Sequence, residues 1–209
     1  APVGAIATGT ARGAYERLLA WLEQDRHARG LIDREYVQLT LARMAEEIHG
    51  ARGAYLNAAQ EFDRTVGPAL THPLVRSLGL VPSCVWRHDA AQRRLQTRWV
   101  RDETINVLRH TTTDRAVTES LALSSMAKAH CADVAMWVTG AALAIAGLGA
   151  GPVRAELEKL WRDAKLTQIY EGTNQLNRLT VYRGLCRGET LPALPPLAGS
   201  GSRRTGVSR

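Results

Sequence analysis

Cysteine is scarce in this chain of 209 residues, and its three copies stand far apart at Cys84, Cys131 and Cys186. An odd number at long spacing, with no C-x-x-C pair, argues against a disulfide framework and against a zinc site. We therefore expect reduced thiols in a cytoplasmic protein. The sequence also shows no positively charged leader followed by an apolar run and a cleavage site, so a secretory signal is not expected.

Long hydrophobic runs and strand-like patterns are missing as well. The most apolar stretch, residues 134–150, is interrupted by glycine and falls short of the ~20 residues that span a bilayer, so no membrane partner is expected. No segment alternates apolar and polar residues with enrichment in β-branched side chains, which argues against a β-sheet. The six histidines lack metal-ligand spacing, and we expect no metal site.

The charge balance is basic, with a formal net charge of +7 and only three lysines among the 27 basic residues. A sequence pI near 9.8 is compatible with nucleic acid or with an anionic cofactor as partner. The chain has no RNA-binding, zinc-finger or basic-zipper pattern. Nucleic acid is therefore not an expected partner.

Apolar residues recur with the period of an α-helix. The clearest repeat steps by four and three residues through eight positions, namely Val37, Leu41, Met44, Ile48, Ala51, Tyr55, Ala58 and Phe62. Such a stripe predicts a long helix that buries one face. The same period predicts inward-facing residues on two further helices, including Ile6, Leu18 and Leu22 on the first and Leu157, Leu160, Trp161 and Ala164 on the second.

The helices predicted in this way cover residues 2–24, 37–62, 116–146, 153–165 and 174–185. Residues 65–82, broken by glycine and proline, are expected to be a connector, and a charged, less regular helix is expected within 88–110. The alanine-rich helix 116–146 is apolar on more than one face, which suits the middle of a bundle or a subunit interface, and the glycine run from Gly147 ends it.

The predicted fold is therefore all-α, an antiparallel four-helix bundle. Residues 1–186 form one domain, and residues 187–209, rich in proline, glycine and serine, form a flexible tail.

The segment Tyr170-Glu171-Gly172-Thr173-Asn174-Gln175 lies between two predicted helices and combines groups that can carry chemistry. A carboxylate precedes a glycine that can adopt unusual dihedral angles, and amide groups follow at a helix start, where free N–H groups favour polar or anionic ligands. In an apolar setting Glu171 could have a raised pKa and act as a general base. The alternative is that Glu171 and Thr173 only cap the helix.

This segment belongs to a longer run, residues 160–176, which reads L-W-R-D-A-K-L-T-Q-I-Y-E-G-T-N-Q-L. The run resembles the C-terminal signature of the acyl-CoA dehydrogenases, in which R-D-A-K and a hydrophobic stretch precede I-Y-E-G-T, then Ser or Asn, then Gln. Two weaker stretches, near residues 2–19 and 127–135, resemble helices of the same C-terminal domain. The resemblance spans residues 2–186, with 65–115 unassigned.

The resemblance implies roles for six residues. Glu171 would be the catalytic base, and Tyr170 would line the acyl pocket. Gly172, Thr173, Gln175 and Arg26 would contact FAD, with Arg26 meeting the cofactor phosphates of a neighbouring subunit. The implied enzyme is an oxidoreductase that acts on the CH–CH group of an acyl-CoA and forms a trans-2-enoyl-CoA.

The same resemblance implies partners. Family members form homo- or hetero-oligomers through this domain and combine it with an α and a β domain, which a second chain would carry here unless the chain is a fragment. Electron-transferring flavoprotein would be the oxidant by analogy. Departures from the family pattern, such as Arg29 in place of an aromatic residue and Ala144 in place of glutamine, would weaken flavin binding. Two alternatives therefore stay open: a partly or non-catalytic subunit that completes a heteromeric acyl-CoA dehydrogenase, or a related flavoprotein oxidase.

Overall fold

The computed structural model describes residues 2–25, 30–71, 73, 107, 112–147 and 151–189, and this part of the chain is helical without strands. Its α-helices are α1 (Pro2–Gln24), α2 (Glu35–Leu70), α7 (Asp114–Ala146), α8 (Gly151–Thr167) and α9 (Asn174–Val181). A 3-10 turn at Leu31–Asp33 precedes α2, and a π-helical turn at Tyr182–Cys186 follows α9. The all-α prediction is confirmed. The helix expected within 88–110 and the tail from 190 onward lie outside the described residues.

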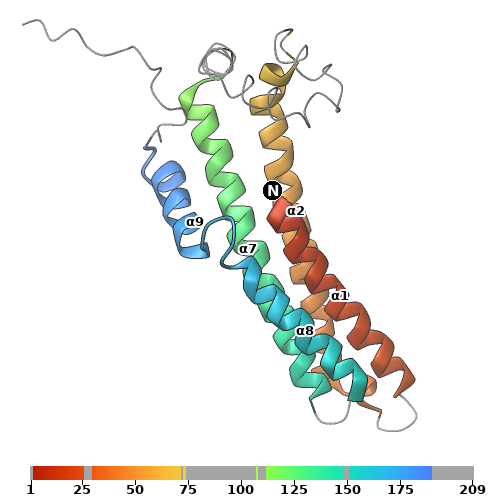
Figure 1. Ribbon diagram of the computed structural model, residues 1–209. Helices are drawn as coiled ribbons and strands as arrows, with labels where there is room; N and C mark the ends of the chain where they lie inside the picture. The colour runs from red at the N-terminus through yellow and green to blue at the C-terminus, as the bar shows by residue number, and fades with distance from the viewer. Residues whose placement is uncertain are drawn as a thin grey trace, which may run out of the picture.

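The helices α1, α2, α7 and α8 form an antiparallel bundle, with α7 packed against each of the other helices (Figure 1). The bundle has a step, because α1 has 23 residues and α8 has 17, whereas α2 has 36 and α7 has 33. The longer helices continue past the start of α1 and the end of α8. The short helix α9 packs against α7 in this upper part.

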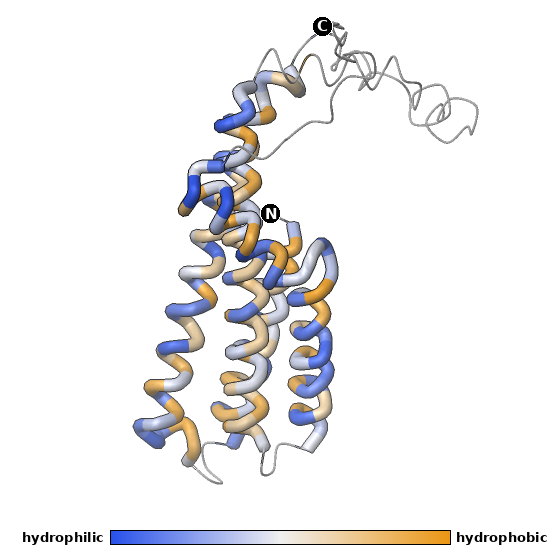
Figure 2. Tube along the Cα trace, turned by 90° about the vertical axis from the view of Figure 1, so that its left-hand side faces the viewer, coloured by the Kyte–Doolittle hydropathy of each residue, from blue (hydrophilic) through white to orange (hydrophobic). Residues whose placement is uncertain are grey.

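The core consists of buried residues from all four bundle helices. Figure 2 shows hydrophobic and hydrophilic residues alternating along the helices. The expected stripe on α2 is confirmed at six positions, since Val37, Leu41, Met44, Ile48, Ala51 and Ala58 are buried. Tyr55 is half-buried against the same core. The buried face of α1 includes Leu18 and Leu22, as predicted.

Three residues predicted to face inward are instead exposed. Phe62 is 45% exposed because it lies beyond the start of α1. The first turn of α1 is level with Tyr55, whose Cβ lies 3.0 Å from the Cβ position of Gly4. Beyond this level α2 has no neighbour from α1. Ile6 stands at the rim of a groove. Trp161 lies on the outer helix α8 and is 41% exposed, with its indole Nε1 3.9 Å from the Cβ position of Gly140.

The expected connector over 65–82 begins later than predicted, because α2 continues through Gly67 and Pro68 to Leu70. Glycine and proline usually end a helix. Here Thr65 and Ala69 are buried, and their packing keeps the chain helical through Gly67 and Pro68. The helix then ends at Thr71, whose backbone N–H donates to the Gly67 carbonyl at 3.0 Å.

The central helix α7 begins at a cap and ends where the glycine run predicts. The Thr113 hydroxyl accepts a hydrogen bond from the Ala116 N–H at 3.2 Å, and α7 stops before Gly147. Among the described helices, α7 alone is long and apolar enough to cross a membrane by length and composition. Half of its most apolar window is buried inside the bundle, which is the setting of a core helix.

The packing of α1 can be tested by truncating one core side chain. We expect Leu18→Ala to lower the free energy of unfolding by about 2–5 kcal/mol, because Leu18 is completely buried and its removal leaves a cavity. The matched control Leu39→Ala, at a side chain that is 63% exposed, should change it by less than about 0.5 kcal/mol. Urea unfolding followed by circular dichroism measures both, and equal effects would contradict the packing described.

Candidate functional site

The segment singled out from the sequence forms the loop between α8 and α9, at the step of the bundle. The Asn174 N–H donates to the Gln168 carbonyl at 3.0 Å and closes the loop on itself. Thr173 then caps α9, since its hydroxyl accepts from the Leu176 N–H at 3.3 Å. The alternative prediction that Thr173 caps the helix is therefore confirmed. The cap uses the hydroxyl oxygen as acceptor, so the O–H group is still able to donate a hydrogen bond.

Two successive residues of the loop have left-handed backbone conformations. Glu171 has a φ of 55° and Gly172 a φ of 86°. Within the described residues, Glu171 is the one non-glycine residue with a positive φ. This conformation costs a residue with a Cβ about 1–2 kcal/mol, so it persists only where the surroundings hold it. Such backbone strain is enriched at functional sites.

A buried lysine from α7 holds this backbone. Lys128 Nζ donates to the Gly172 carbonyl at 2.7 Å and to Asn174 Oδ1 at 2.8 Å. The Gly172 carbonyl also accepts from Asn177 Nδ2 at 2.9 Å. Lys128 is only 5% exposed, and this burial lowers the pKa of its ammonium group, an effect that the negative charge of Asp133 partly offsets.

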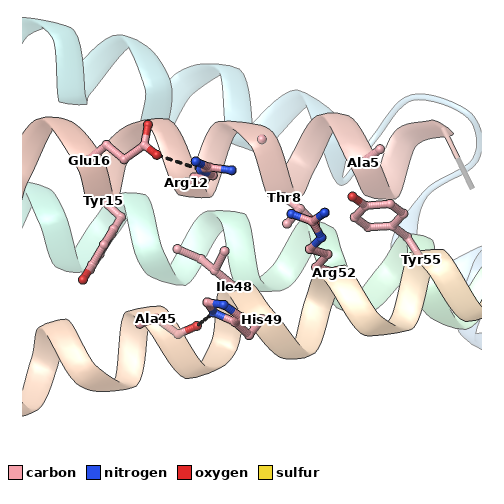
Figure 3. A pocket seen from close by; sticks show the side chains of 11 residues that line it. Ala5, Thr8, Arg12, Tyr15, Glu16, Ala45, Ile48, His49, Arg52 and Tyr55 are labelled. Carbon is pink, nitrogen blue, oxygen red and sulfur yellow. Dashed lines mark hydrogen bonds and ion pairs between the residues drawn. The ribbon is translucent and has the colours of Figure 1, made fainter.

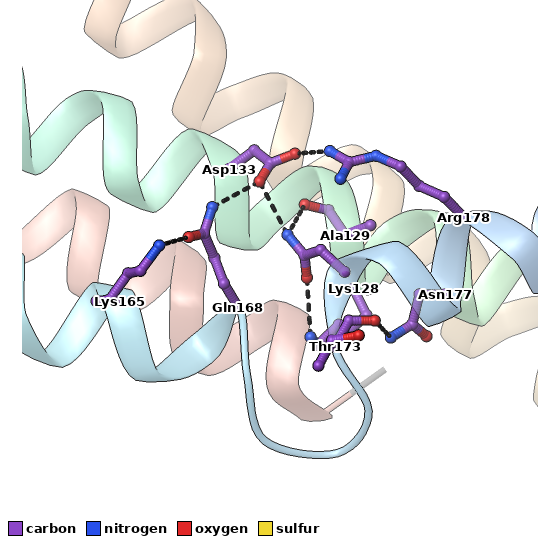
Figure 4. A network of polar contacts seen from close by, with 9 residues as sticks. Lys128, Ala129, Asp133, Lys165, Gln168, Thr173, Asn177 and Arg178 are labelled. Carbon is purple, nitrogen blue, oxygen red and sulfur yellow. Dashed lines mark hydrogen bonds and ion pairs between the residues drawn. The ribbon is translucent and has the colours of Figure 1, made fainter.

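Asp133, five residues further along α7, bonds to both ends of the loop (Figure 4). One carboxylate oxygen accepts from Gln168 Nε2 and from Asn174 Nδ2, each at 2.8 Å, and the other oxygen is paired with Arg178. Asn174 is 3% exposed, and its amide nitrogen also donates to the Ala129 carbonyl at 3.2 Å. The network joins the end of α8, the loop and the start of α9 to a single helix.

The loop faces an open groove of about 490 Å³ at the step of the bundle. Tyr170 and Glu171 line one side of it, and the opposite sides come from the start of α1 and from α7. Its lining is Pro2, Val3, Ile6, Leu121, Ser124, Ser125, Lys128, Tyr170, Glu171 and Asn177. The side chain of Glu171 is exposed, so the described residues do not supply the apolar enclosure expected around it. An exposed carboxylate needs a further surface to become enclosed.

The remaining predicted site residues lie in the same loop, at the start of α9, or outside the described residues. Thr173 and Gln175 are exposed at the start of α9, and Gly172 is half-buried in the loop. A Cβ on Gly172 would meet only ordinary contacts, the nearest at 3.5 Å, so the positive φ is what favours glycine there. Arg26 lies outside the described residues.

These residues fit part of an FAD site. The Thr173 hydroxyl and the Gln175 amide are exposed polar groups at a helix start, next to the groove that Glu171 lines. They offer donors and acceptors to one edge of a flavin. No described residue covers the groove from outside, so the fit concerns one side of the cofactor only.

Sequence reasoning missed Lys128 and Asp133, and it named Asn174 only as one of the amides at the helix start, without its buried contacts to α7. A signal was present for Lys128, because the positions three and four residues away on its helix carry Ser124, Ser125, Cys131 and Ala132, none of them acidic. A lysine without a charged neighbour on a largely apolar helix indicates a distant partner.

A second groove of about 450 Å³ lies between α1 and α2 and contains none of the predicted site residues (Figure 3). Its polar lining includes Arg12, which is paired with Glu16 at 2.7 Å, and His49, whose Nδ1 lies 2.9 Å from the Ala45 carbonyl. These groups satisfy one another within single helices. The loop groove is therefore the candidate site.

The left-handed loop backbone can be tested with two glycine-to-alanine substitutions of opposite expected sign. Gly172→Ala should lower the free energy of unfolding by about 1 kcal/mol, because alanine is strained at a φ of 86°. Gly50→Ala should raise it by about 0.5–1 kcal/mol, because Gly50 lies inside α2 with nothing within 4 Å of its Cβ position. Chemical denaturation of both variants gives the values, and a stabilising Gly172→Ala would contradict the loop conformation.

The lowered pKa of Lys128 predicts a pH dependence of stability. Between this lowered pKa and the usual 10.5, the unfolded state binds a proton that the folded state has released, so the contribution of Lys128 rises with pH in this window. Conversely, this contribution of Lys128 to the free energy of unfolding is lost as pH falls through the lowered pKa. The stability of the wild type relative to Lys128→Met should therefore increase as pH approaches 10.5 in urea unfolding, and a decrease would show that the pKa is raised instead.

This chain is similar to known proteins over most of its length. Residues 1–74 and 83–186 match the family model described as acyl-CoA dehydrogenase, C-terminal domain. The cyclohexane-1-carbonyl-CoA dehydrogenase of Geobacter metallireducens is 27% identical over 187 residues, which cover 88% of this chain and 35% of that protein. This chain thus spans about a third of that relative's length.

Two further relatives match over shorter stretches. A probable acyl-CoA dehydrogenase, FadE25, of Mycobacterium tuberculosis is 43% identical over 65 residues, 31% of this chain and 17% of that protein. The cyclohex-1-ene-1-carbonyl-CoA dehydrogenase of Geobacter metallireducens is 48% identical over 62 residues, 29% of this chain and 16% of that protein. Since the family model covers most of the chain and the bundle is the fold expected for it, this chain belongs to the acyl-CoA dehydrogenase family, with the match to its C-terminal domain.

Proposed function

We propose that this chain supplies the catalytic base, Glu171, for the FAD-dependent α,β-dehydrogenation of an acyl-CoA to the trans-2-enoyl-CoA. The observation that carries the proposal is the position of Glu171, on a strained loop at the rim of a groove with apolar walls. A carboxylate held at a fixed place next to a substrate-sized groove is what proton abstraction requires. Membership of the family supports the same reaction.

In this reaction the chain's own residues bind the acyl group and move one proton. The Glu171 carboxylate accepts the proton from the α carbon of the thioester. Val3, Ile6 and Leu121 provide apolar surface for the acyl chain, and Tyr170 lies beside the base. FAD, when bound, supplies the acceptor for the hydride that leaves the β carbon.

Gly172, Thr173 and Gln175, from the loop and the start of α9, would hold FAD. Arg26 would bind the phosphates of the FAD in a neighbouring subunit. The exposed hydroxyl and amide support hydrogen bonding to one edge of the cofactor. The guanidinium of Arg26 is suited to phosphate because it can donate two parallel hydrogen bonds.

A second candidate function is that of a subunit that completes a heteromeric acyl-CoA dehydrogenase with little or no turnover of its own. The open groove favours this second function, because Glu171 is exposed and only the surface of another chain or domain would exclude water from it. Exposed apolar side chains on α9 and on the π-helical turn after it offer contact area for such a partner, namely Leu176, Leu179, Tyr182 and Leu185. Purification with a flavin absorption band that an acyl-CoA bleaches would separate the first function from the second.

The role of Glu171 can be tested in the assembled flavoprotein. Glu171→Gln should slow the anaerobic bleaching of the flavin band by an acyl-CoA by about 10²–10⁴-fold, because glutamine has the shape of glutamate and cannot accept the α proton. The control Glu46→Gln, an exposed carboxylate on α2, should leave the rate unchanged. Stopped-flow absorbance measures both, and equal rates for Glu171→Gln and wild type would remove Glu171 from the mechanism.

A further inference from the structure

We propose that Lys128 is a positioning residue for Glu171, which acts by fixing the backbone of the loop through the Gly172 carbonyl. Its Nζ donates to that carbonyl at 2.7 Å, across a sequence separation of 44 residues. The part of this inference that concerns catalysis rests on the proposed function. The part that concerns the loop backbone does not.

The geometry shows why one contact controls the base. The Gly172 carbonyl belongs to the second of the two left-handed residues, so its direction depends on the backbone torsions of Glu171 and Gly172. Lys128 and Asn177 both donate to this oxygen and hold it toward α7. Without them the strained backbone can relax toward ordinary φ values, and the side chain of Glu171 then leaves its place on the groove.

Lys128 is the rigid member of this pair of donors. It lies on the central helix α7, is buried, and lines the same groove as Glu171. Asn177 lies on the short helix α9, whose own position depends on the loop. Support for the loop from outside its own segment therefore comes from α7, through Lys128 and Asp133.

A purely structural role would not need a charge at this position. Burying an ammonium group is costly, and an apolar side chain of similar length often gives equal or greater stability. The charged group that acts on Lys128 is Asp133 on its own helix, which is itself paired with Arg178 on α9, and Glu171 on the loop lines the same groove as Lys128. What the ammonium adds is a strong, directed bond to a carbonyl oxygen, which an apolar residue cannot replace.

The experiment is residue-resolved amide exchange of the full chain, compared between wild type and Lys128→Met. The Asn174 N–H, which closes the loop onto the Gln168 carbonyl, is the main reporter, with the amides of Ile169 and Tyr170 beside it. We expect exchange at these amides to become at least about tenfold faster in Lys128→Met, while exchange in the middle of α2 changes little.

Thr139→Val is the matched control, because Thr139 is fully buried on the same helix and its hydroxyl bonds only to carbonyls of α7. It should leave the loop amides at their wild-type rate. If Lys128→Met does not fold, Lys128→Gln, which keeps one shorter neutral donor, takes its place with a smaller expected acceleration. Unchanged loop exchange in the folded variant, or equal acceleration in Thr139→Val, would overturn the inference.

In the assembled flavoprotein the same variant separates positioning from binding. Lys128→Met should lower kcat about 10–100-fold and change KM for the acyl-CoA less than about threefold, because a displaced base affects the proton transfer more than ground-state binding. If Glu171→Gln abolishes turnover and Lys128→Met leaves kcat unchanged, the positioning role is wrong and the proposed function stands. If Glu171→Gln has no effect, the proposed function fails, and loop exchange alone decides the role of Lys128.

Discussion

The position of the loop between α8 and α9 depends on one buried ammonium group that bonds to a loop carbonyl. Lys128 lies on the central helix of the bundle, and Gly172 lies in the loop that carries the only strained non-glycine residue of the described part. The apolar side chains of the loop, Ile169 and Tyr170, are exposed, and hydrogen bonds to α7 hold the loop in place. A polar network inside the protein is effective in this role because its bonds are directional and are strengthened by the low local dielectric.

The unequal lengths of the helices place this network at the edge of a groove. Since α1 starts and α8 ends part of the way along α7, the bundle has a step, and the loop crosses it. The groove at this step has one wall from α1, one from α7 and one from the loop itself. Under the proposed function, this carboxylate at the step is one side of the active site, and surface from elsewhere would supply the cover that excludes water.

Much of the fold could be predicted from the sequence, because burial follows helical periodicity. The repeat from Val37 to Ala58 predicted one face of α2, and Gly147 marked the end of α7. The errors arose where tertiary contacts decide. Periodicity could not show that α2 loses its neighbour before Phe62, or that buried Thr65 and Ala69 carry the helix past Pro68. Similarly, the family signature pointed to Glu171, whereas Lys128 and Asn174 meet only in three dimensions, 46 residues apart in sequence.

The most direct measurement of the central contact is nuclear magnetic resonance of lysine side chains labelled with ¹³C at Cε. The chain has only three lysines, so the signal of Lys128 can be assigned by substitution. The structure predicts nuclear Overhauser contacts between the Lys128 ε protons and the α protons of Gly172, and a titration midpoint below 10.5. A Lys128 signal without contacts to the loop, titrating at the ordinary lysine value, would contradict the account.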